Sequence, residues 1–136
     1  MDTKFEELCS ELEAAIQDAY ENTPSLLEAE KLASKFLYAL MVVSSELSKA
    51  DLDARTRKSG VKAIRARVYL DEVAKNDKKP SDAMLNAIVD TNEIVNGEQA
   101  AFDKADVLRA ELERKLDTYN QAHIHMRQLS KGTFNG

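Results

Sequence analysis

The residues of this chain best suited to chemistry are a run of cations that could bind phosphate groups. Six basic residues fall in one short segment with no acidic residue among them, and they are Arg55, Arg57, Lys58, Lys62, Arg65 and Arg67. At about 100° per residue, Arg55, Lys58, Lys62 and Arg65 share one stripe of an α-helix, and Tyr69 lies on the same side. Cations bind phosphates and an aromatic ring stacks on an exposed base, so the pattern predicts a surface for a single-stranded polyanion.

A basic run has other interpretations, which stay open at this point. It can be a solvated helix face neutralised by acids, and the first helix holds seven acidic residues against Lys4 alone. Basic amphipathic helices also bind anionic membranes or calmodulin-like partners. The last two fit less well, because the neighbouring apolar strip of Val61, Ile64 and Val68 lacks Trp and Phe and is needed for a core.

The chain carries none of the short motifs that mark common catalytic or cofactor sites. It has no glycine-rich phosphate loop, no nucleophile elbow and no HExxH zinc motif. His123 and His125 are two positions apart, which points them in different directions on a helix. Asp90 and Glu93 are expected on an exposed acidic face, and the single Cys9 as a buried thiol. We therefore expect no enzyme, no cofactor and no metal site.

Composition indicates an all-α fold. Of 136 residues, 43% are apolar, and only four Gly and two Pro interrupt the chain, so we expect one helical domain over residues 1–136. The pattern predicts an acidic N-terminal helix in 1–22, central helices with the basic stripe in 25–75 and a long C-terminal helix in 81–130. Continuity across Lys49 is left open. The last segment is one helix, or two joined near Gly97.

The cellular setting also follows from composition. The formal net charge is −5, and no apolar run approaches the roughly 20 residues that a membrane span needs. The N-terminus is acidic where a signal peptide would be basic. We expect a cytoplasmic protein without membrane contact.

The C-terminal segment contains a seven-residue repeat. Ala105, Leu112, Tyr119 and Met126 occupy its first position, and Leu116 widens the apolar stripe. Two interpretations are equally open: an amphipathic helix packed within its own protomer, or a bundle between subunits. The candidate oligomerisation residues are Leu108, Leu112, Leu116, Tyr119 and Met126.

Two segments carry a resemblance to a known family. Ile64, Arg65, Ala66 and Arg67 stand where that family has a Leu-Lys-Ala-Arg core, and Tyr69 stands where tyrosines follow it. Residues 123–127 are similar to the family's His-Ile-x-x-Met-Arg ending, with one residue fewer between Ile and Met. The family is that of the phage recombination mediators, the UvsY family of T-even-like phages. The resemblance covers residues 30–131 and leaves out the acidic first helix.

The resemblance implies a small non-enzymatic homo-oligomer that binds single-stranded DNA. Such mediators help a RecA-like recombinase to replace single-strand-binding protein, in the cytoplasm of the infected host cell. Arg65 and Arg67 would inherit DNA contacts at matched positions. An elongated helical protomer repeated around a ring would join the basic stripes into one phosphate track. The alternative is a structural or adaptor protein of a phage that binds only protein partners.

Overall fold

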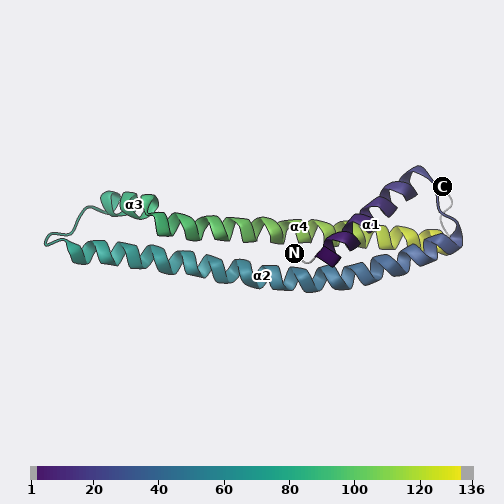
Figure 1. Ribbon diagram of the computed structural model, residues 1–136, viewed down its shortest axis with the longest axis horizontal. Helices are drawn as coiled ribbons and strands as arrows, with labels where there is room; N and C mark the ends of the chain where they lie inside the picture. The colour runs from purple at the N-terminus through teal and green to yellow at the C-terminus, as the bar shows by residue number, and fades with distance from the viewer. Residues whose placement is uncertain (1–2, 133–136) are drawn as a thin grey trace. The chain divides into compact units, whose positions relative to one another are not determined.

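The protein is all-helical over the residues that the computed structural model describes, 3–132, where no strand occurs (Figure 1). The four helices are α1 (Thr3–Glu21), α2 (Leu26–Lys75), α3 (Asp82–Thr91) and α4 (Glu93–Ser130). The chain divides into two compact units. Unit 1 contains the residues up to Leu47 and those from Leu112 onward, and unit 2 contains Ser48–Glu111. Between residues 3 and 132, no helix is long and apolar enough to cross a membrane.

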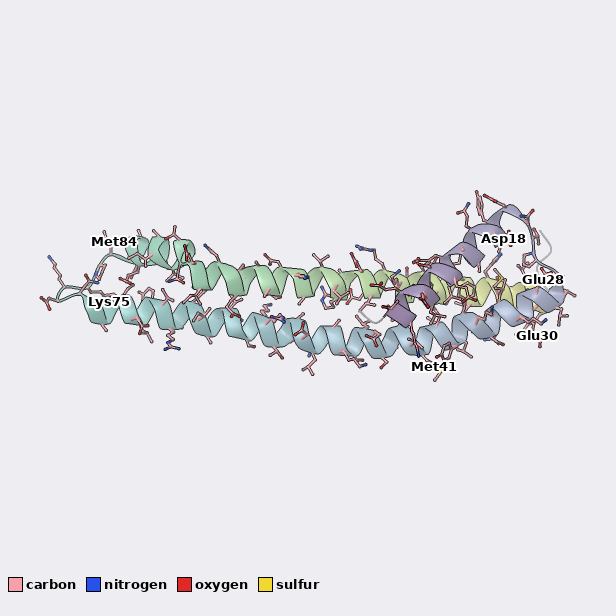
Figure 2. All side chains as sticks on the ribbon, viewed as in Figure 1. Asp18, Glu28, Glu30, Met41, Lys75 and Met84 are labelled. Carbon is pink, nitrogen blue, oxygen red and sulfur yellow. The ribbon has the colours of Figure 1, made fainter. Side chains whose placement is uncertain are left out.

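Two of the predicted helix starts are capped by serine side chains. The backbone N–H of Glu28 donates to Ser25 Oγ over 3.2 Å at the start of α2. The N–H of Met84 donates to Ser81 Oγ over 3.2 Å at the start of α3. Each hydroxyl satisfies an amide that the first helical turn leaves without a partner. Figure 2 shows Lys75 and Met84 on either side of the loop that joins α2 to α3.

The central segment is one continuous helix of 50 residues. Neither Lys49 nor Gly60 interrupts it. Glycine weakens a helix but leaves its backbone hydrogen bond intact, unlike proline. A Cβ built on Gly60 would come no closer than 3.9 Å to a neighbouring atom, Glu98 Oε2.

The C-terminal segment is two helices, and the break lies at Asn92 rather than near Gly97. The Asn92 side-chain oxygen accepts from the backbone N–H of Ile94 over 2.9 Å and of Val95 over 3.1 Å. Its own backbone N–H donates to Val89 over 3.2 Å, which closes α3. One asparagine therefore ends α3 and caps α4, whereas Gly97 continues the helix.

Unit 1 packs α1 against the first half of α2 and the second half of α4. Phe36 and Tyr119 are fully buried, with ring centroids 6.1 Å apart and planes tilted by 44°. The Nδ1–H of His123 donates to the carbonyl of Ala33 over 2.9 Å, since a carbonyl can only accept. The pairs 33 with 123 and 36 with 119 make the two helix segments antiparallel. α1 adds buried Phe5, Cys9 and Leu12, which confirms the expected buried thiol.

The side chain of Tyr119 brings a polar hydroxyl into this core. Burial raises the pKa of Tyr119 far above its ordinary value, and the neighbouring Cys9 thiol and Glu13 carboxylate raise it further. The hydroxyl lies 3.5 Å from Glu13 Oε1, and Lys115 Nζ approaches the same oxygen at 2.6 Å. These surroundings therefore keep the Tyr119 side chain in its neutral, protonated form.

Unit 2 packs the second half of α2 against α3 and the start of α4. Small side chains dominate on α2, where the buried residues are Ala50, Ala54 and Val61. α3 contributes Leu85 and Val89, and α4 contributes Val95 and Ala105. Small residues allow helices to approach closely, so this core is thin and depends on few side chains.

Gly60→Ala and Gly97→Ala are expected to raise the free energy of unfolding by about 0.5–1 kcal/mol each. Both glycines lie inside helices with room for a methyl group. Gly132 has a φ of 64°, so Gly132→Ala should lower stability or leave it unchanged. Urea unfolding followed by circular dichroism measures all three variants. A loss of stability in Gly60→Ala would contradict the free space described beside Gly60.

Tyr119→Phe is expected to shift the alkaline unfolding of the protein to higher pH. The raised pKa means that the folded state holds the phenolic proton more tightly than the unfolded state. That stabilisation is complete below the unfolded pKa of about 10 and is lost as the pH rises above it. Phe has no proton to lose, so the variant should keep its helicity to higher pH. Tyr20→Phe, at a residue that is 88% exposed, is the control, and identical alkaline profiles for wild type and Tyr119→Phe would contradict the prediction.

Candidate nucleic-acid interface

All six cations of the predicted stripe region lie on α2 within unit 2. Their side chains are exposed except that of Arg65, which is half-buried, and Tyr69 is also half-buried. Val61 is buried, and Ile64 and Val68 are half-buried, as expected for the apolar strip that faces the core. The helix therefore turns its cations outward by burying the strip beside them.

The first two arginines pair with acids one turn earlier on the same helix. Arg55 Nη2 lies 3.1 Å from Asp51 Oδ2, and Arg57 Nε lies 3.2 Å from Asp53 Oδ1. The Arg55 side chain is 77% exposed. Exposed pairs at this spacing contribute only about 0.3–0.5 kcal/mol, so both arginines can exchange the carboxylate for a phosphate.

Lys58 and Lys62 form the open part of the stripe. Within residues 3–132 neither makes an ion pair or a side-chain hydrogen bond, and both side chains are exposed. One helical turn separates them, which places them on the same side of α2. They are the cations most available to an anionic partner.

Arg65 and Tyr69 contact α3 instead of facing solvent freely. Arg65 Nη2 donates to Asp90 Oδ1 over 2.7 Å, and the Tyr69 hydroxyl donates to Asp82 Oδ1 over 3.2 Å. These acids lie 25 and 13 residues away in sequence, so no local pattern could reveal the pairing. The acids that pair with the basic run therefore come from unit 2. In unit 1, Glu11 of α1 pairs with Lys35 over 3.1 Å.

Arg67 lies on another flank of α2. It lines a shallow surface hollow together with Gly60, Ala63, Ile64 and Glu98. Arg65 and Arg67 are about 200° apart on an ideal helix, which accounts for their different neighbours. The predicted binding residues thus fall into four groups. Arg55 pairs along the helix, Lys58 and Lys62 are open, Arg65 and Tyr69 are bound to α3, and Arg67 lies apart.

The candidate oligomerisation residues lie mostly inside the chain's own core. Leu112, Tyr119 and Met126 are 1%, 0% and 2% exposed, and Leu108 and Leu116 are half-buried. Ala105 is buried as well, so the seven-residue repeat correctly marks the buried positions of α4. These residues pack as an amphipathic helix within the protomer, one of the two interpretations left open. The three fully buried side chains present no surface to a second subunit.

The structure groups no set of metal ligands in the part of the chain that it describes. Between residues 3 and 132 no cluster of three or more His, Cys, Asp or Glu side chains could hold a metal ion. Asp90 and Glu93 belong to different helices, separated by Asn92. His123 is engaged with a backbone carbonyl.

Comparison of the chain with family models, with curated proteins and with solved structures finds no match to any of them. The likeness to the recombination mediators therefore rests on residues 64–69 and 123–127 of the sequence.

Leu112→Ala is expected to lower the free energy of unfolding by about 2–5 kcal/mol, because it leaves a cavity in a closed core. The loss should be the same at every protein concentration, since the leucine packs within one chain. Thermal unfolding at several concentrations measures this, with half-buried Leu108→Ala as the milder control. The opposite result would place Leu112 between subunits. In that case the melting temperature of the wild type would rise with protein concentration, and that of Leu112→Ala would not.

Proposed function

We propose that this protein binds single-stranded DNA through the exposed cations of α2 in unit 2. Lys58 and Lys62 are the direct phosphate contacts, and Arg55 joins them after exchanging Asp51 for a phosphate. The observation that carries the proposal is the pair of exposed lysines without an acidic partner, within the described residues, on a helix segment free of acids. No catalytic step is involved.

The charge balance of the two units supports this location. Unit 2 contains twelve basic and twelve acidic residues, so the formal net charge of −5 belongs entirely to unit 1. Within unit 2 the cations concentrate on α2 between residues 55 and 67. A polyanion approaching that face meets a local positive potential that the net charge conceals.

The stripe suits contacts to the backbone more than contacts to base edges. Lysine acts as a point charge for phosphate, and the arginine fork can take two phosphate oxygens. Binding of this kind is largely independent of sequence and strongly dependent on salt. Single strands fit better than duplexes because Tyr69 offers a ring to an unstacked base once its hydroxyl leaves Asp82.

The sequence resemblance extends the proposal to a mediator role. The protein would help to load a RecA-like phage recombinase in place of single-strand-binding protein. Assembly into a ring-like homo-oligomer would join several basic stripes. Avidity would then raise the affinity for a single strand above that of one protomer. Such an assembly needs an interface outside the buried side chains of Leu112, Tyr119 and Met126.

A second candidate function is a structural or adaptor protein that binds only protein partners. The contacts of Arg65 with Asp90 and of Tyr69 with Asp82 favour it, because they use two of the predicted DNA-binding side chains inside unit 2. In that case the lysines serve solubility or meet an acidic protein surface. DNA binding separates the two candidates.

Lys58→Ala combined with Lys62→Ala is expected to weaken binding to a fluorescein-labelled oligo-dT. The log-log dependence of affinity on salt should become less steep by about 0.7 for each phosphate that the variant no longer binds. Fluorescence anisotropy over a salt series measures both quantities.

The matched control is Lys31→Ala with Lys104→Ala, which removes the same charge from exposed positions outside the stripe. It should leave affinity and slope close to those of the wild type. Equal decreases in affinity in both double variants would mean that only overall charge matters. Absence of binding by the wild type at low salt would favour the adaptor function.

A further inference from the structure

α3 is held on unit 2 by a small apolar interface. It has ten residues, of which only Leu85 and Val89 are buried. The loop 76–81 precedes it, and the single non-helical residue Asn92 follows it. Isolated helices of this length are unstable in water, so α3 depends on what it packs against.

Two carboxylates on α3 contact the basic side of α2. Asp90 accepts from Arg65 over 2.7 Å, and Asp82 accepts from Tyr69 over 3.2 Å. Both carboxylates remain accessible, since the Asp90 side chain is 60% exposed and that of Asp82 is 76% exposed. These interactions can therefore break and re-form without opening the core.

Asp90 stands at a position that does not favour the helix itself. It lies in the last turn of α3, where no basic residue is present and where the helix dipole disfavours a negative charge. The ion pair with Arg65 compensates for that cost. Asp82, in contrast, lies in the first turn, where an acid is favourable.

We propose that α3 is an autoinhibitory element of the basic face, with Asp90 and Asp82 occupying the groups of Arg65 and Tyr69 that a single-stranded nucleic acid would use. A carboxylate and a phosphate compete for the same guanidinium, because both offer paired anionic oxygens. Lys58 and Lys62 bind the strand first, and the strand then displaces the two carboxylates. This inference rests on the DNA-binding function proposed above.

Displacement leaves α3 held on unit 2 mainly by its apolar side chains, of which Leu85 and Val89 are buried. Its backbone amides should then exchange with solvent faster when oligo-dT is bound than when the protein is free. Those of α2 should not. The strand thus changes both the charge and the mobility of this surface.

The test is the affinity of Asp90→Ala and of Asp82→Asn for fluorescein-labelled oligo-dT at low salt. Each variant should bind about twofold to fivefold more tightly than the wild type, the range expected for release of one exposed ion pair or hydrogen bond. Asp103→Asn is the control, because it removes one negative charge from α4 of unit 2 where the carboxylate accepts only from Gln99 among the interactions described. It should change affinity less than either α3 variant.

A double variant shows whether the gain passes through Arg65. In the background of Arg65→Ala, Asp90→Ala should no longer tighten binding, since the competing group is gone. Equal gains from Asp90→Ala and Asp103→Asn, or a gain that survives Arg65→Ala, would overturn the autoinhibitory role while DNA binding stands. If neither wild type nor Asp90→Ala binds oligo-dT, the proposed function fails and α3 has nothing to inhibit.

Discussion

The packing of the seven-residue repeat of α4 against α2 is the interaction on which unit 1 depends. Phe36 and Tyr119 meet at its centre, and Leu112 and Met126 are buried one repeat to either side of Tyr119. Neither helix could bury its apolar stripe alone, because most of the stability of a helix in a protein comes from packing its apolar face. α1 then closes the unit, with Glu13 placed beside Lys115 and Tyr119.

Unit 2 also buries an apolar face of α2, but with smaller side chains, so packing stabilises it less. Alanines on α2 allow close approach, but each buries little apolar area. The polar interactions at the edge of this core, above all Arg65 with Asp90, consequently matter more than they would beside a large core. A region that buries little apolar surface is where local opening costs least. The candidate binding face lies in that region.

The two units also differ in charge, and the difference bears on how an acidic protein could bind a polyanion. Unit 1 carries the whole formal net charge of −5. Unit 2 has equal numbers of acidic and basic residues, and its cations concentrate on α2. Within the described residues, the cations between residues 55 and 67 fall into three environments. Arg55 and Arg57 are paired along the helix, Lys58, Lys62 and Arg67 make no ion pair, and Arg65 is bound to α3. Only the second group is ready for a partner without any rearrangement. The exposed side chains of α2 in unit 1 include the apolar residues Leu37, Tyr38 and Met41. Figure 2 labels Met41.

The sequence by itself determined the helical class, the helix starts near residues 25 and 81 and the buried positions of α4, because capping and periodicity are local properties. It also located the cations on one helix. It did not locate the break at Asn92, since an asparagine occurs both inside helices and at helix caps and the spacing of apolar residues does not distinguish the two. An apolar stripe does not specify its partner, so it took the fold of unit 1 to show that Leu112, Tyr119 and Met126 of α4 are buried within the chain. The pairing of Arg65 and Tyr69 with α3 likewise required the tertiary structure, which brings together residues that no sequence spacing connects.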